Sequence, residues 1–77
     1  MNTSQNKAFR MQLLAILNSV HHEHPDDQIF SRVVNQRTED KNIWADVEIR
    51  IENPTTGYES GWYWINAIGV GPRGRII

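Results

Sequence analysis

The stretch Ile43-Trp44-Ala45-Asp46-Val47-Glu48-Ile49-Arg50-Ile51-Glu52 places apolar residues at its odd positions and charged residues at its even positions, with Trp44 as the one exception. Alternation with a period of two is typical of a β-strand that has one side in a core and the other side in water. The odd-numbered side is therefore expected to lie against the rest of the domain.

A second strand is expected at residues 58–68, after the turn sequence Asn53-Pro54-Thr55-Thr56-Gly57. Proline presets the φ angle of an early turn position and glycine accepts a positive φ, so these five residues favour a 43–52/58–68 hairpin. If Glu52 lies opposite Tyr58, the predicted core face consists of Ile43, Ala45, Val47, Ile49, Ile51, Tyr63, Ile65 and Ala67. The opposite face consists of Trp44, Asp46, Glu48, Arg50, Glu52, Trp62, Trp64 and Asn66. A bulge at Gly61 would instead turn Trp62 and Trp64 to the core side.

The segments before the hairpin complete an α+β domain. Residues 5–22 are predicted to form a helix, because apolar residues recur at spacings of three and four: Phe9, Leu13, Ile16, Leu17 and Val20. Pro25 ends this helix by about His24. Residues 25–37 fit either a strand or a short second helix that starts at Pro25, and the helix is the preferred interpretation. Arg75-Ile76-Ile77 is a candidate edge strand.

Length and composition narrow the class of protein. A chain of 77 residues predicts one small domain, residues 1–77, with residues 1–4 and 71–77 as its flexible ends. The absence of cysteine excludes disulfides, zinc thiolate sites and cysteine nucleophiles. No apolar run is long enough to span a bilayer and no signal peptide is recognisable, so a cytoplasmic protein without membrane contact is expected. The net charge of −1 provides no overall field that would attract nucleic acid.

The three tryptophans are the strongest functional signal. Large apolar rings among charged residues are typical of a binding surface, or of a second core face covered by another segment or a second copy of the chain. Arg50 is expected to be the one basic residue on this face, so most of the carboxylates would be left uncompensated. Carboxylates repel phosphate. We therefore expect a protein partner or self-association, and a non-enzymatic inhibitor or adaptor that uses Trp44, Asp46, Glu48, Arg50, Trp62 and Trp64.

Nucleic-acid binding is the alternative hypothesis. Pro72-Arg73-Gly74-Arg75 resembles part of an AT-hook, a short Arg-Gly-Arg element that enters the minor groove, although Ile76 replaces the proline that usually follows. The resemblance covers four residues. The alternative site would combine Arg50, Arg73 and Arg75 with the tryptophan rings.

Metal binding and catalysis find little support in the sequence. The segment His21-His22-Glu23-His24-Pro25-Asp26-Asp27 has the composition of a metal cluster. Consecutive residues at a helix end splay apart, however, whereas a metal site needs three or four converging ligands. No nucleophile lies beside a recognisable base, so we expect no enzymatic activity, no metal and no cofactor.

Overall fold

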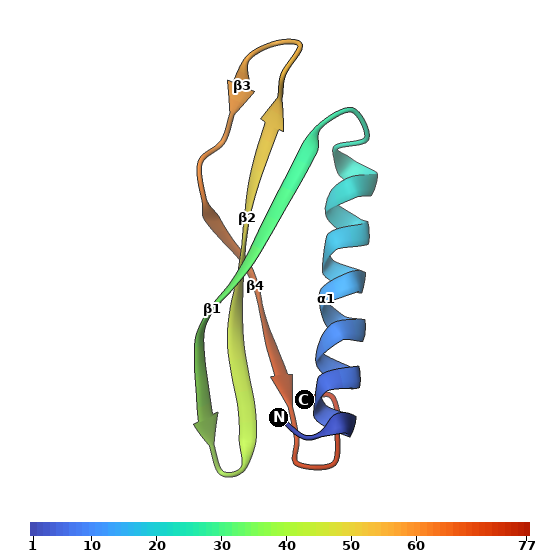
Figure 1. Ribbon diagram of the computed structural model, residues 1–77, viewed down its shortest axis with the longest axis vertical. Coiled ribbons are helices and arrows are strands. Elements are labelled where there is room, and N and C mark those ends of the chain that lie inside the picture. The colour runs from blue at the N-terminus through green and yellow to red at the C-terminus, as the bar shows by residue number, and fades with distance from the viewer.

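A computed structural model describes residues 1–77 as one helix followed by an antiparallel sheet. The elements are α1 (Thr3–Glu23), β1 (Gln28–Glu39), β2 (Asn42–Asn53), β3 (Tyr58–Glu59) and β4 (Tyr63–Val70). β2 is the central strand, with β1 on one edge and both β3 and β4 on the other. The helix lies along one side of the twisted sheet, and both termini lie at the same end of the molecule (Figure 1). The predicted α+β fold is confirmed.

Helix α1 has the predicted position and the predicted buried stripe. It begins with a capping box, in which the Asn2 side chain accepts a hydrogen bond from the Gln5 backbone and the Gln5 side chain accepts one from the Asn2 backbone. It ends at Glu23, shortly before Pro25. No helix of the structure has the length and apolar character needed to cross a membrane.

The core lies between α1 and the odd-numbered side of β2, as the alternation in residues 43–52 predicted. One buried cluster, near the start of the helix, consists of Ala8, Phe9, Ala45, Val47, Ile68 and Val70. A second cluster, near the end of the helix, consists of Val20, Ile49 and Ile51. The side chains of Val47 and Ile49 have no solvent exposure at all, so β2 is the strand on which both clusters depend.

The preferred interpretation of residues 25–37 as a helix is wrong, because residues 28–39 form the strand β1. Ile29 lies opposite Ile51, and Val33 lies opposite Val47. The backbone groups along the free edge of β2 need hydrogen-bond partners, and β1 supplies them over almost its whole length. The β-branched residues of this segment then fit a pleated surface.

The predicted register of the hairpin is also wrong, because the segment that was predicted as one strand forms both β3 and β4 and contains two irregularities. Asn53 rather than Glu52 lies opposite Tyr58, so pairing begins one residue away from the prediction. The strand then breaks after Glu59, where Gly61 adopts a φ of 71°. The Ser60 hydroxyl accepts a hydrogen bond from the Ile51 backbone N–H at 2.9 Å, which replaces a missing ladder bond.

A bulge at Ile65 exchanges the faces of two residues. Trp64 lies opposite Glu48, but Asn66 lies opposite Val47, so Ile65 is the extra residue. Asn66 was predicted on the tryptophan side and lies on the helix side. Ala67 was predicted in the core and lies on the tryptophan side, opposite Asp46. The bulge brings the larger side chain of Ile68 into the core, where it is fully buried.

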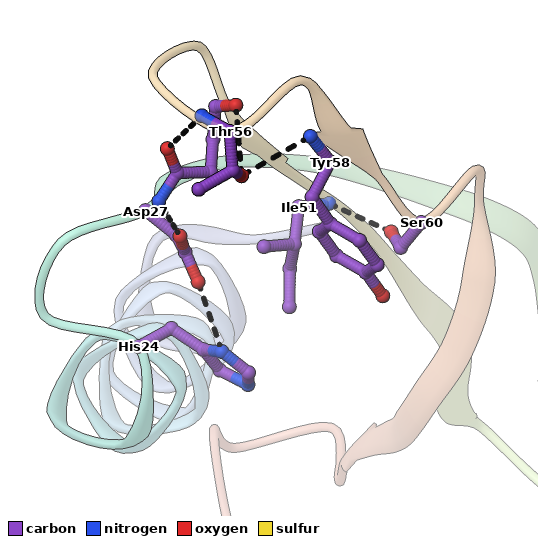
Figure 2. Close-up of polar contacts among 7 residues, drawn as sticks. His24, Asp27, Ile51, Thr56, Tyr58 and Ser60 are labelled. Carbon is purple, nitrogen blue, oxygen red and sulfur yellow. Dashed lines mark hydrogen bonds and ion pairs between the residues drawn. The ribbon is translucent and has the colours of Figure 1, made fainter.

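A polar network beside the hairpin turn joins that turn to the end of α1. Figure 2 shows that Asp27, in the α1–β1 connection, contacts both the helix end and the hairpin. Its carboxylate accepts a hydrogen bond from the Asn53 side chain at 2.8 Å and contacts His24 Nδ1 at 3.2 Å. The Asn53 side chain in turn accepts a hydrogen bond from the Thr56 backbone N–H at 3.1 Å. The turn predicted from sequence is thereby attached to the end of α1.

Candidate interaction surface

The side of the sheet that faces away from α1 is called the outer face below. No element of the chain covers it (Figure 1). It holds all six residues that the sequence analysis selected for protein binding: Trp44, Asp46, Glu48, Arg50, Trp62 and Trp64. Trp64 is 57% exposed and Trp62 is 38% exposed, so two large indole rings meet solvent on the same side of the sheet.

Strand β1 adds Phe30, Arg32 and Arg37 to the outer face, and the sequence analysis missed all three. Phe30 lies opposite Arg50, Arg32 opposite Glu48, and Arg37 opposite Trp44. The expectation that Arg50 is the one basic residue to offset the charge of the carboxylates is therefore wrong. Apolar residues in this segment come in adjacent pairs, Ile29-Phe30 and Val33-Val34, so no alternation marked its two faces before β1 was placed beside β2.

Two arginines pack on the ring of Trp62. The guanidinium carbon of Arg32 lies 4.3 Å from the ring centroid, and its Nε donates a hydrogen bond to Glu48 at 2.7 Å. The guanidinium of Arg50 lies 4.4 Å from the Phe30 ring and 5.6 Å from that of Trp62. Contacts of this kind are worth about 0.5–1 kcal/mol each at exposed sites. The Trp62 indole is thereby in contact with two cations.

The same arginines neutralise the acidic residues around them. Arg50 forms ion pairs with Glu52 and, at 3.2 Å, with Glu59. Since Glu48 is already paired with Arg32, no carboxylate in this part of the face is left without a cation. The surface is consequently close to neutral and carries both signs of charge interspersed.

Trp64 belongs to a second polar cluster, centred on Asp46. The indole Nε1 donates to Asp46 Oδ1 at 3.3 Å, and the Asn35 side chain donates to Asp46 Oδ2 at 3.2 Å. Arg37 lies 3.5 Å from the same carboxylate. The hydrogen bond from Asn35, followed by that from Trp64, holds the pKa of Asp46 below its usual value, and the charge of Arg37 acts in the same direction.

This cluster predicts how the Trp64 indole responds to acid. A carboxyl group whose pKa is lowered by folding contributes stability above its unfolded-state pKa, and this contribution is lost as the pH falls through the folded-state pKa. In a titration from about pH 6 to about pH 2, the indole N–H resonance of Trp64 should shift with a midpoint below 3.8, the ordinary value for aspartate. Asp46→Asn should abolish the transition. A midpoint at or above the ordinary value would contradict the hydrogen bonds.

Trp44 has a different role from the other two tryptophans. Its ring lies on the backbone of Gly69, which is its neighbour on β4. A Cβ atom added to Gly69 would lie only 2.5 Å from Trp44 Cζ3, so only glycine allows the ring to lie this close. Trp44 is half-buried and mainly packs within the sheet, while Trp62 and Trp64 are the accessible rings.

The remaining candidate residues do not converge. His21 and His22 are exposed, His24 contacts Asp27, and no group of three or more His, Asp or Glu side chains is placed to hold a metal ion. Arg50 lies on the outer face, whereas Arg73 and Arg75 lie beside Asn42, at the start of the same strand. The separation along β2 is roughly 26 Å at about 3.3 Å per residue, so the three arginines of the alternative hypothesis are not brought together.

Comparison with known proteins does not change this picture. No protein-family model matches the chain, and no similar protein was found among curated sequences or solved structures.

Proposed function

We propose that the protein is a small non-enzymatic protein-binding module of the inhibitor or adaptor type, and that it contacts its partner through the outer face. The observation that carries this proposal is the pair of accessible indoles, Trp62 and Trp64, on a sheet face that the chain leaves uncovered. Tryptophan and arginine are the residues in which binding energy is most often concentrated. A cytoplasmic location, compatible with the absence of cysteine, is part of the proposal.

The arrangement of charges favours a protein partner over a nucleic acid. Arg32, Arg37 and Arg50 are each paired with a carboxylate, so none is free to meet a phosphate without losing an ion pair. The stacked guanidinium groups also hold Trp62 in place before binding, which lowers the entropy lost when a partner docks.

A second copy of the chain is the simplest partner. A face of one sign would repel its own copy, but this face combines both signs and is nearly neutral, so two copies can meet with opposite charges adjacent. The exposed rings of Trp64 and Trp62 would then be buried against the partner face.

Sedimentation analysis tests this proposal without knowledge of any other partner. Over about 1–500 µM, we expect the wild type to form a dimer that persists at about 0.5 M salt, because apolar burial is not screened. Trp64→Ala should weaken dimerisation by at least about tenfold, in line with a central interface tryptophan. Leu14→Ala is the matched control, because Leu14 is similarly exposed (59%) on the helix, away from the outer face.

The outcomes separate the homodimer from the wider proposal. A dimer that both variants preserve would place the interface elsewhere. A wild type that stays monomeric would exclude self-association and leave a different protein as the partner. In that case, a captured protein that binds wild type and Leu14→Ala but not Trp64→Ala is expected. Equal capture by all three would exclude the outer face.

A further inference from the structure

The charges of the molecule are separated along its long axis of 45 Å. One half contains the start of α1, the β1–β2 turn and the C-terminal tail (Figure 1). Its basic residues are Lys7, Arg10, Arg37, Lys41, Arg73 and Arg75, and its acidic residues are Glu39, Asp40 and Asp46. The other half has two basic and six acidic residues. Stability of the helix does not explain this polarity, since a helix is stabilised by acidic residues near its start, and the first turn of α1 has none.

A groove of about 650 Å³ lies at the basic end. It is formed by Asn42, Gly71, Pro72, Arg73, Arg75, Ile76 and Ile77 and is called the tail groove below. Its volume is within the usual range for small-ligand sites. The lining residues combine two arginines and one asparagine with a proline and two isoleucines.

The tail that forms this groove is closed on itself. The Gly71 N–H donates to the Arg75 carbonyl at 2.7 Å, and the Gly74 N–H donates to the Gly71 carbonyl at 3.0 Å. Val70 pairs with Ile76 in an isolated β-bridge. Arg73 and Arg75 are therefore carried by a closed turn.

The start of the helix fixes this turn in place. The Asn2 side chain donates to the Pro72 carbonyl at 2.8 Å, and the buried Gln5 side chain donates to the Gly71 carbonyl at 3.1 Å. A Cβ atom on Gly74 would lie 2.6 Å from the Ser4 carbonyl oxygen, so the turn and the helix are in direct backbone contact. The arginines thus project from an anchored position, and ordering them for a ligand requires little further loss of backbone entropy.

Arg73 and Arg75 differ from the arginines of the outer face in lacking acidic partners. Arg32, Arg37 and Arg50 all have a carboxylate within 4.0 Å, and neither groove arginine has one. A planar guanidinium group forms paired hydrogen bonds with phosphate oxygens. Two such groups match the roughly twofold negative charge of free phosphate, or the single charges of two successive phosphodiester groups in a nucleic-acid backbone.

We infer that the tail groove is a phosphate-binding site, with Arg73 and Arg75 as the anion-binding residues and the Asn42 side chain as an additional hydrogen-bonding group. The ligand is a phosphate group, either free or within a nucleic-acid backbone. This site is separate from the outer face and does not depend on its function. A long polyanion would contact only this end, because the other half of the molecule carries an excess of acidic residues.

Backbone amide NMR at low salt tests the site with two probes, inorganic phosphate and a short single-stranded oligothymidylate. We expect saturable shifts of the amides of residues 71–77 and of the Asn42 side chain. The double substitution Arg73→Gln, Arg75→Gln should weaken binding by at least about tenfold, because it removes both charged donors. For the oligonucleotide, the slope of log K against log salt should flatten by about 1.4.

Arg10→Gln is the matched control, because it removes one positive charge from the same end but lies outside the groove. Its binding should remain close to wild type. Saturation by phosphate alone would identify a small ligand, and saturation by the oligonucleotide alone would identify a nucleic acid; both would support the groove. No saturable shift with either probe, or equal weakening by Arg10→Gln and the double substitution, would overturn the inference.

Discussion

Ile68→Ala is expected to remove about 2–5 kcal/mol from the free energy of unfolding, as is usual when a large aliphatic side chain is truncated in a core. Ile68 has no solvent exposure and belongs to the cluster that α1 covers near its first half. A domain of this size is stable by only about 4–12 kcal/mol, so the variant should lose a large share of its stability. Urea denaturation followed by tryptophan fluorescence measures the loss.

Ala67→Lys is the control that makes this experiment a test of the bulge at Ile65. With the bulge, Ala67 lies opposite Asp46 on the outer face, where a lysine can extend into solvent. The change should then cost less than about 0.5 kcal/mol, as is usual for surface substitutions. Without the bulge, Ala67 would lie beneath the helix and a lysine there would unfold the domain, while Ile68→Ala would have little effect. The two variants therefore give opposite results for the two registers.

Gly74→Ala is expected to destabilise the protein by about 2–5 kcal/mol through two separate effects. The φ angle of Gly74 is 80°, a conformation that costs a residue with a side chain about 1–2 kcal/mol. The added methyl group would also overlap the Ser4 carbonyl oxygen, and overpacking of this kind costs about 1–3 kcal/mol. The variant should lose phosphate binding in parallel if the anchored turn organises the tail groove.

Gly57→Ala separates these two effects. Gly57 has nearly the same φ, 79°, but no atom lies within 4 Å of the position that a Cβ would occupy. It should therefore show only the conformational cost of about 1–2 kcal/mol. If the two alanine variants are equally stable, the contact between the tail and the start of α1 contributes nothing to folding, and the anchoring of Arg73 and Arg75 would be refuted.

Local sequence patterns determined the helix and the central strand. The capped apolar stripe of α1 and the strict alternation of β2 are each encoded within one segment, because helix and strand periodicities depend only on neighbouring residues. The same alternation placed Trp44, Asp46, Glu48 and Arg50 on the outer face. Turn chemistry at residues 53–57 placed the hairpin within one residue of its observed start.

The tertiary structure alone decided the state of residues 28–39. Within that segment, helix and strand preferences were nearly balanced, and the free edge of β2 determined the result by offering backbone hydrogen bonds that a helix would leave unmade. Arg32 and Arg37 reached the outer face as a consequence. The sequence contained both arginines, but the neutrality of that face follows only from the position of β1 beside β2.

Tertiary packing also set the register of β3 and β4 against β2 and the position of the C-terminal tail. The break at Gly61 and the bulge at Ile65 leave Trp62 and Trp64 on the outer face while Ile68 enters the core, an arrangement that depends on how side chains fill the space under α1. The tail groove likewise arises from contacts between residues about seventy positions apart. Sequence periodicity is local and describes single elements, whereas contacts between distant segments depend on the packing of the whole domain.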